Sequence, residues 1–444
     1  MPADRLRQAA RAIWQAALAA GDVAPLLERA LHLHGSRLIA GPLDIDLDTV
    51  DRLFVLGCGK AGASMARALE ARLGDRVRDG FVVVKDGYAA PTRRVRVVEA
   101  GHPVPDARGL AASRALLDAA GAAGERDLVI FLVSGGGSAL TPAPAPPVTL
   151  DEKQAVTRGL LAAGATIGEL NAVRKHLSLL KGGQLARAAA PARVLTLALS
   201  DVIGDPLDVI ASGPTAPDAS TFADALHVLE RRAVMGEAPA SIVARLRAGA
   251  RGEIAETPKA GDAIFERVTN LVIGNNALVV DAAVSRARAL GYAPVLLTRT
   301  LEGEAREAAR SLVAQARALR APACLVAGGE TTVTVRGAGR GGRCQEFALA
   351  AAREIEGSDD VVVLAAGTDG TDGPTDAAGG LVDGGTATRV AAAGGDVASA
   401  LEDNDAYRAL DLAGDLISTG PTNTNLLDLY LVVRNGAQRV SEAL

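Results

Sequence analysis

The sequence is poor in aromatic residues, in cysteine and in lysine. Aromatic residues make up only 2% of the 444 residues, so the hydrophobic cores must be built from Ala, Val and Leu. Three cysteines, Cys58, Cys324 and Cys344, are odd in number, lie far apart and form no CxxC pair. This pattern argues against disulfides or structural zinc and for a reducing compartment. The chain has six lysines against 41 arginines, so the positions that keep a lysine are informative.

Long hydrophobic runs and a strong net charge are also missing. No apolar run reaches the roughly 20 residues of a membrane-spanning helix. The first residues lack the apolar core and the cleavage site of a signal peptide. A formal net charge of -5 gives no basic field toward nucleic acid or anionic membranes. We therefore expect a cytoplasmic protein that binds neither nucleic acid nor membranes.

The fold class indicated by the sequence is α/β. Hydrophobic residues make up 49% of the chain, and its length predicts two or three domains. Apolar runs such as 128–133 and 361–365 are continuous, which is typical of strands buried on both faces. Alternation of such runs with helical segments predicts mostly parallel sheets covered by helices on both sides. The strand signal is weakest over 236–262, which places the domain boundary between 235 and 236.

Three local predictions accompany this assignment. Residues 332–335 are predicted as a strand, residues 168–187 as one amphipathic helix, and His32 and His34 as part of an exposed helix face. For the last predicted strand, 429–433 within the segment 415–444, the sequence leaves open whether it pairs within the second domain or returns to the sheet of the first domain. The five histidines lie too far apart in sequence for a metal motif.

Glycine, serine and aspartate cluster directly after six predicted strands, at residues 55–62, 131–140, 197–205, 272–276, 325–331 and 363–373. In open α/β sheets, ligands bind beyond the carboxyl ends of the strands. The clusters therefore predict a polar ligand site at this edge.

The first cluster has the GxGxxG pattern of Gly57, Gly59 and Gly62, with Lys60 inside it and Asp86 after the next strand. This is a dinucleotide fingerprint in outline, but it lacks the Walker A spacing. A lysine at a helix N-terminus opposes the helix dipole, and a bound anion would relieve that conflict. The alternative is a tight turn with an exposed lysine.

The second cluster is Ser134-Gly135-Gly136-Gly137-Ser138. Its amide and hydroxyl groups can donate to an oxyanion. The hydrolase motif G-x-S-x-G fails, because Leu140 stands where the last glycine belongs. A plain glycine-rich turn is the alternative.

The helical segment 168–187 carries a polar face formed by Asn171, Arg174, Ser178 and Lys181. Two of the six lysines, Lys175 and Lys181, lie here within seven residues. The face either binds an anion or is merely solvated.

Aspartates follow two strands, as Asp201 and Asp205 and as Asp369 and Asp372. Carboxylates at a strand end suit magnesium bound together with phosphate, or one of them can act as a base. The spacing excludes an EF-hand, and aspartates that only form turns are the alternative.

In the second half, Gly341 and Gly342 precede Arg343, whose guanidinium is suited to a phosphoryl group. A turn whose arginine binds nothing is the alternative. Further candidates for binding nucleotide or phosphate are Gln345, Glu346, Thr368, Asn423 and Asn425, together with the glycines Gly57, Gly59, Gly62, Gly341 and Gly342.

Together these motifs resemble the glycerate 2-kinase family, whose carboxyl-terminal domain is called MOFRL. The resemblance runs from the first helix to residue 434. It rests on segments such as GCGKAGASMA (57–66), SGGGSAL (134–140), LNAVRKHLSLLKGGQLA (170–186), SDVIGDPLDVIASGPT (200–215), GGRCQEFALA (341–350) and AAGTDGTDGPTDAAGG (365–380).

The resemblance implies ATP-dependent phosphorylation of D-glycerate to 2-phosphoglycerate with Mg²⁺. It also implies two domains with the active site in the cleft between them. These would be an amino-terminal Rossmann-like domain with a three-layer sheet, residues 1–235, and a carboxyl-terminal MOFRL-type α/β domain, residues 236–444. Lys60 and Arg343 match the family's important lysine and arginine. Cys344, Asn423 and Leu427 depart from the residues expected at their positions, which bears on pocket polarity and substrate preference.

On this basis we assign Lys60, Arg343 and Asp201 to catalysis. The substrate glycerate is assigned to residues 134–138 and Arg174, and the metal to Asp205, Asp369 and Asp372, although the sequence does not divide base and metal roles among the aspartates. An NAD(P)H-dependent hydroxypyruvate reductase is the alternative activity. It explains the GxGxxG pattern and Asp86 but neither Lys60 nor the loops of the second half. A non-catalytic sugar-acid sensor is a third class, and a homodimer is left open.

Overall fold

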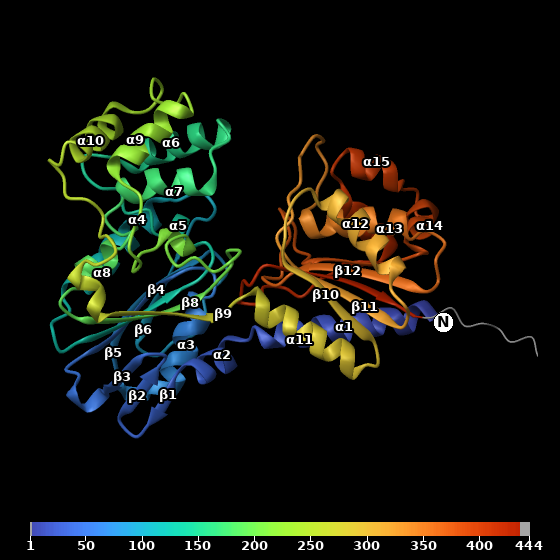
Figure 1. Ribbon diagram of the computed structural model, residues 1–444, viewed down its shortest axis with the longest axis horizontal. Helices are drawn as coiled ribbons and strands as arrows, with labels where there is room; N and C mark the ends of the chain where they lie inside the picture. The colour runs from blue at the N-terminus through green and yellow to red at the C-terminus, as the bar shows by residue number, and fades with distance from the viewer. Residues whose placement is uncertain (1, 436–444) are drawn as a thin grey trace, which may run out of the picture. The chain divides into compact units, whose positions relative to one another are not determined.

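The computed structural model describes residues 2–435 and divides into two compact units (Figure 1). Residues 23–273 form the first unit, and the described residues on either side of this stretch form the second unit. The predicted boundary between 235 and 236 differs from this division. Helix α10 (Ala240–Ala250) buries Ile242 and Leu246 against Phe222 of α9 (Phe222–Arg231), which ties residues beyond 236 to the first unit.

The first unit contains a six-stranded sheet of order β6-β5-β4-β7-β8-β9. The strands are β4 (Leu53–Cys58), β5 (Val77–Lys85), β6 (Val95–Ala100), β7 (Leu128–Val133), β8 (Arg193–Leu199) and β9 (Val268–Gly274). The pairs from β6 through β8 are parallel, as predicted. The central strand β7 is buried along its whole length. Parallel order brings the carboxyl ends of β4, β5, β7 and β8 to one edge of the sheet.

Helices of the first unit are α2 (Val23–Ala30), α3 (Gly62–Leu73), α4 (Ala107–Gly121), α5 (Gly137–Leu140), α6 (Leu150–Ala162), α7 (Ile167–His176), α8 (Gln184–Ala189), α9 and α10. Short 3-10 turns span Leu47–Thr49, Gly74–Arg76, Ile210–Ser212 and Ala263–Arg267. Helices α6, α7, α9 and α10 gather beyond the sheet edge around a shared apolar cluster (Figure 1). This helical group supplies one wall of the pocket described below.

A small antiparallel sheet of β1 (His32–His34), β2 (Arg37–Ala40) and β3 (Leu43–Asp46) completes the first unit. The prediction of a helix at His32 and His34 is therefore wrong. Both residues lie in a short exposed strand closed by a tight turn at Gly35, whose φ of +63° favours glycine.

The second unit contains a six-stranded sheet of order β10-β11-β15-β12-β13-β14. Its strands are β10 (Ala293–Leu301), β11 (Ala323–Gly329), β12 (Val361–Gly367), β13 (Gly379–Asp383), β14 (Leu416–Ile417) and β15 (Asp428–Arg434). Among the described strand pairs of this sheet, only β10–β11 is parallel, so the sheet is not mostly parallel as expected. Strand β15 lies antiparallel between β11 and β12 and does not join the first unit's sheet. The rest of the predicted segment, beyond residue 435, lies outside the described residues.

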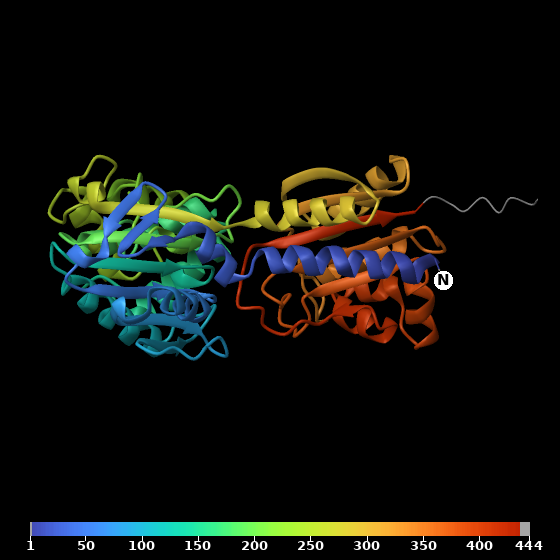
Figure 2. The ribbon, with the colours of Figure 1, turned by 90° about the horizontal axis from the view of Figure 1, so that it is seen from below.

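Helices of the second unit are α1 (Pro2–Ala20), α11 (Asn276–Ala289), α12 (Ala305–Ala318), α13 (Arg343–Glu354), α14 (Thr386–Ala392), α15 (Val397–Glu402) and α16 (Ala406–Ala413). Helix α1 contacts α11, β12 and β15, and Figure 2 shows it running along this sheet. Residues 332–335 form no strand; only Thr332 makes a single bridge, to Glu304. None of the described helices is both long and apolar enough to cross a membrane.

Candidate functional site

The turn after β4 is fixed by close contact with the turn after β7. Gly59 has a φ of +123°, and a Cβ there would lie 2.3 Å from Ser134 Oγ. The Lys60 amide donates to the Gly135 carbonyl at 2.9 Å, and the Ala61 amide donates to Ser134 Oγ at 3.0 Å. Only a glycine permits this approach, so the GxGxxG pattern here builds a junction between two loops that positions Lys60.

The side chain of Lys60 starts beside the glycine loop. A Cβ placed on Gly136 would lie 3.6 Å from Lys60 Cγ and 3.0 Å from the ring of His102. Gly136 itself has a φ of +84°. The structure thus brings together two motifs that are 76 positions apart, Lys60 and the loop at 134–138, as the sequence predicted for strand ends at one edge.

Ser134 and Ser138 in the glycine loop differ in their surroundings. Ser134 is fully buried, and its hydroxyl accepts the Ala61 amide. Ser138 is partly exposed, and its Oγ lies 2.9 Å from Ser212 Oγ, which donates to Asn171 Oδ1 at 3.0 Å. Ser138 is therefore the serine of this loop that faces accessible space, while Ser134 supports the loop junction.

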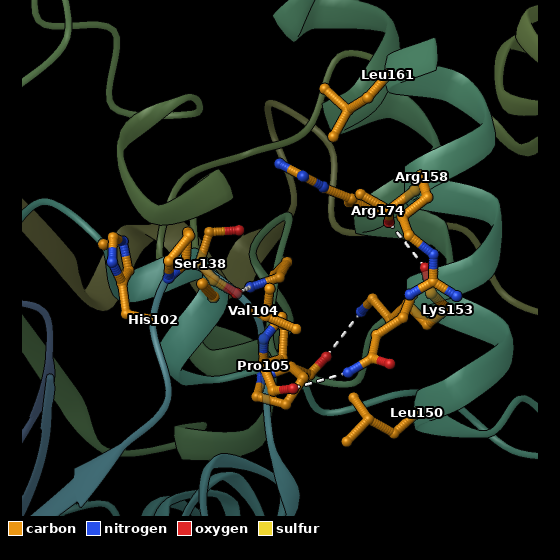
Figure 3. A pocket seen from close by; sticks show the side chains of 16 residues that line it. His102, Val104, Pro105, Ser138, Leu150, Lys153, Arg158, Leu161 and Arg174 are labelled. Atoms are coloured by element: carbon orange, nitrogen blue, oxygen red, sulfur yellow. Dashed lines mark hydrogen bonds between the residues drawn. The ribbon is translucent and has the colours of Figure 1, made fainter. Parts of the chain in front are cut away.

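A pocket of about 440 Å³ opens beside this loop. Figure 3 shows His102 and Ser138 on one side and Lys153, Arg158 and Arg174 on the helical side. The lining residues are His102, Pro103, Val104, Pro105, Gly136, Ser138, Ala139, Pro142, Leu150, Lys153, Gln154, Thr157, Arg158, Leu161, Arg174 and Lys181. Four of these are cationic, and none of the described lining residues is acidic.

The predicted helix 168–187 is two helices. Helix α7 ends at His176, and α8 begins at Gln184, directly after Gly182 and Gly183, which adopt positive φ angles. Arg174 reaches the pocket from the last turn of α7, and Lys181 from the turn between the helices. The two cations thus reach the same pocket without sharing one helix face.

Two buried lysines bind only backbone carbonyls among the described groups. Lys181 Nζ donates to the carbonyls of Ser138 and Thr141 at 2.8 and 3.1 Å. Lys153 Nζ, from α6, donates to those of Pro142 and Leu177 at 2.7 and 3.3 Å. Lys153 was not among the predicted site residues. Its signal is its place on the apolar stripe of α6, where the buried residues are Lys153, Val156 and Leu160.

Burial changes the acidity of these cations. It lowers the pKa of Lys181 to about 7, with a further contribution from the nearby Arg174 charge. It also lowers the pKa of Lys153 and that of Arg174. Lys175 is different, because its Nζ pairs with Asp218 and Asp208 at 3.2 and 3.3 Å. Lys175 therefore has a structural partner, whereas the pocket cations have none among the described acids.

The predicted aspartates of the first unit lie in the loop after β8. Asp201 and Asp205 are both partly buried, and Asp205 has a φ of +57°. The loop continues to Ala211 and Ser212, which also have positive φ angles. Asp86 is occupied elsewhere, because both of its carboxylate oxygens accept from Arg108, at 2.7 and 2.8 Å.

In the second unit, Arg343 begins α13 and is held by two acids. Its Nε and Nη2 donate to Asp428 at 2.6 and 3.0 Å, and its Nη1 lies 2.9 Å from Glu330. Burial alone would lower the pKa of Arg343, but the charge of Asp428 raises it above its usual range. The guanidinium therefore stays charged in a fixed orientation.

Asp428 was missed by the sequence analysis. It begins β15, is fully buried, and lies opposite Gly329 of β11 and Gly367 of β12. Tyr430 Oη donates to it at 3.0 Å. Its signal in the sequence is an acid inside the apolar run from Leu426 to Val433.

Asp372 and two predicted residues of α13, Gln345 and Glu346, are buried in the second unit. A Cβ on Gly342 would lie 2.3 Å from the Asp372 carboxylate, which accepts the Gln345 amide at 2.8 Å. Burial, together with the Asp428 charge, raises the pKa of Asp372 to about 7. Gln345 Nε2 donates to Thr375, and Glu346 pairs with Arg306 at 2.5 Å. These contacts give Gln345 and Glu346 structural roles, and nucleotide binding by them stays a prediction.

The remaining predicted residues shape the loops around Gly367. Thr368 Oγ1 donates to the Leu427 carbonyl at 2.8 Å and accepts the Leu426 amide at 2.7 Å, so it joins two loops. Asn423 and Asn425 are partly buried in the second of these loops, and Asn423 has a φ of +58° that asparagine tolerates. Gly341 packs near Ala406 and lies beside Gly373.

Asp369, a predicted metal ligand, and Asp428 both lie beside Gly367. A Cβ on Gly367 would lie 3.3 Å from Asp428 Oδ1 and 3.5 Å from Asp369 Oδ1. Asp369 Oδ1 also accepts the Thr371 amide at 3.1 Å. Within residues 2–435, no group of three His, Cys, Asp or Glu side chains is placed to hold a metal ion.

Two α/β units with glycine loops at strand ends, and a pocket lined by cations, are features typical of proteins that bind anionic ligands. Two family models match the chain: a domain of unknown function, DUF4147, over residues 9–247, and the MOFRL family over residues 323–428.

The similarity to known relatives extends over most of the chain. D-glycerate 2-kinase of Thermotoga maritima is 46% identical over 86% of this chain and 90% of the relative. The crystal structure of glycerate kinase from Thermotoga maritima matches with a TM-score of 0.84 and 41% identity, over 97% of this chain and 100% of that one. A relative from Agrobacterium vitis, provisionally named hydroxypyruvate reductase, is 42% identical over 86% of this chain and 87% of its own. The chain belongs to the glycerate kinase family, and the predicted resemblance is confirmed. Cys344, one of the departures from the family pattern, lies in the hydrophobic core of the second unit.

Proposed function

We propose that this chain is a glycerate 2-kinase, which transfers a phosphoryl group from ATP to the 2-hydroxyl of D-glycerate. The observation that carries the proposal is the similarity over most of the chain to D-glycerate 2-kinase of Thermotoga maritima. The first unit supports it, because both substrates are anions and the pocket is lined by four cations without a described acid.

Phosphoryl transfer needs positioned positive charge more than covalent chemistry. Lys60 suits this task, because its backbone is bound to Gly135 and its stem lies beside Gly136 at the pocket. Arg343 suits it because Asp428 fixes its guanidinium. We propose that each cation binds phosphate oxygens of a substrate, and that Asp201 is the base for the glycerate hydroxyl.

Magnesium bound with ATP would supply further positive charge. Such a magnesium ion usually takes only one or two protein carboxylates. Asp369 fits this role, because the small space at Gly367 brings it near Asp428. Asp205 stays a second proposed ligand. Asp372 fits poorly, since it is buried, accepts a backbone amide and has a raised pKa.

The test is an assay of the purified full chain with D-glycerate and Mg·ATP, read as ADP release, beside hydroxypyruvate with NADH. We expect ADP release, a product identified as 2-phosphoglycerate by NMR, and a loss of about 100-fold in Lys60→Ala. The matched control is Lys85→Ala, which removes a lysine from the carboxyl end of the neighbouring strand β5 and should change turnover less than about two-fold. Consumption of NADH without ADP release would refute the proposal.

The position of Asp86 does not favour the alternative activity, an NAD(P)H-dependent reductase. The dinucleotide fingerprint uses an acid to bind the ribose, whereas both Asp86 oxygens are bound to Arg108. The turn at Gly59 is filled by Ser134.

A further inference from the structure

The pocket of the first unit is larger and more apolar than glycerate needs. Its volume of about 440 Å³ falls in the range, roughly 300–1,000 Å³, of pockets for drug-sized ligands. Much of its wall is formed by Val104, Pro105, Leu150 and Leu161 (Figure 3). D-glycerate carries a hydroxyl or carboxyl oxygen on every carbon and has no apolar part to cover this wall.

The same pocket demands negative charge. Lys153 and Lys181 are 6% and 1% exposed, and their ammonium groups bind only neutral carbonyls among the described groups. Burying a cation without an opposite charge is costly, and an anionic ligand offsets this cost. Arg158 and Arg174 add two further cations to the lining. The ligand is therefore an anion that also carries an extended apolar surface.

We propose that this pocket binds the nucleotide substrate, with the base and ribose against the apolar side chains and the polyphosphate against the lysines and the glycine loop. The identity of the nucleotide as ATP rests on the proposed function. The proposal replaces the sequence-based assignment of residues 134–138 and Arg174 to glycerate.

The position of Lys60 gives the nucleotide a direction. Gly136 lines the pocket, and Lys60 Cγ lies 3.6 Å from where a Cβ of Gly136 would stand. A polyphosphate laid along the glycine loop would extend toward Lys60, so the reacting phosphoryl group meets the cation that the loop junction positions.

Leu161→Glu tests the proposal without disturbing the core. Leu161 lies at the pocket and is 54% exposed, so the change removes apolar ligand contact and adds a negative charge at little cost to folding. Ile167→Glu is the matched control, because Ile167 is 58% exposed and does not line the pocket. Binding of Mg·ATP alone and of D-glycerate alone to the full chain is measured by isothermal titration calorimetry.

We expect Leu161→Glu to weaken ATP binding at least tenfold and to leave D-glycerate binding within about twofold, with Ile167→Glu like the unchanged chain. Equal ATP affinity in the two variants, or no ATP binding to the unchanged chain, would overturn the proposal. Weakening confined to D-glycerate would return the pocket to the hydroxy acid and overturn it as well. The measurement does not require turnover, so a chain that binds ATP but releases no ADP with D-glycerate refutes the proposed function separately.

Discussion

Gly59→Ala adds one methyl group at the junction of two loops, and the structure defines what that methyl would meet. It would lie 2.3 Å from Ser134 Oγ and 2.4 Å from the Ser134 carbonyl oxygen. Real Cβ atoms do not approach other atoms so closely, so the two loops must separate. The φ of +123° is also a conformation that alanine rarely adopts.

The expected cost has two parts. A side chain held in a sparsely populated backbone region costs about 1–3 kcal/mol, and an overpacked contact costs about 1–3 kcal/mol more. Gly87→Ala provides the matched control, because Gly87 has a φ of +82° and nothing within 4 Å of its would-be Cβ. The effect of Gly87→Ala, subtracted from that of Gly59→Ala, leaves the cost of the contact with Ser134, about 1–3 kcal/mol. At roughly 2–4 °C per kcal/mol, this contact should lower the midpoint of thermal unfolding by about 2–12 °C.

Activity should respond more strongly than stability. Separation of the loops breaks the bonds from the Lys60 and Ala61 amides to Gly135 and Ser134, and so moves Lys60. A displacement of about 1 Å in a positioning group costs roughly 100-fold in rate. We expect that loss in ADP release for Gly59→Ala and less than about threefold for Gly87→Ala. If the two variants melt and turn over alike, the junction does not position Lys60, and the reasoning fails.

Three further changes test the charges of both units. Asp428→Asn should lower the free energy of unfolding, measured by denaturant titration, by about 3 kcal/mol and should also lower turnover. This value is the low end for a broken buried pair, because Arg343 is one-third exposed. The control is Asp360→Asn, whose carboxylate is more exposed and whose loss should cost less than about 1 kcal/mol. ATP binding at pH 8 should take up protons, because Lys181, with a pKa of about 7, is mostly neutral there and an anion raises its pKa. Calorimetry in two buffers of different ionisation enthalpy measures this uptake. Lys181→Met should reduce it, and Lys153, whose pKa burial also lowers, can supply the remainder. The raised pKa of Asp372 means that between pH 3.8 and about 7 the folded chain holds a proton that the unfolded chain has lost. The stability of the fold therefore decreases as pH rises through this range. Asp372→Asn should make this decrease smaller, as measured by thermal midpoints at pH 5 and pH 7.5.

The sequence was sufficient for most strands of the two large sheets but not for their directions in the second unit. The short strands β1, β2 and β3 and the strands β13 and β14 were not predicted. Apart from 332–335, the predicted strands exist, because a continuous apolar run buried on both faces is a strong local signal. The apolar pattern of such a strand is the same whether the neighbouring strands are parallel or antiparallel to it. Strand β15 therefore gave no local sign that it lies antiparallel between β11 and β12. The association of α1 with the second unit, more than 250 residues away along the chain, has no local signature either.

The candidate site was predictable where one segment carries the chemistry. The glycine loops, Lys60 and the lysine at 181 were identified because their composition is unusual over a few residues. Asp428 was missed because its role comes from Arg343, which lies 85 positions away. Lys153 was missed although its spacing to Val156 and Leu160 places it on the buried face of α6, where a lysine is rare.

The buried lysines show how this fold separates structural from ligand-binding charge. Lys153, Lys175 and Lys181 are half of all six lysines, and each is at most 6% exposed. Lys175 is compensated by the buried carboxylate of Asp218, which is 1% exposed. The other two line the pocket and bind carbonyls that carry no net charge. Without an acid beside them, burial lowers the pKa of both pocket lysines. The anionic substrate proposed above would supply the opposite charge that Asp218 supplies to Lys175.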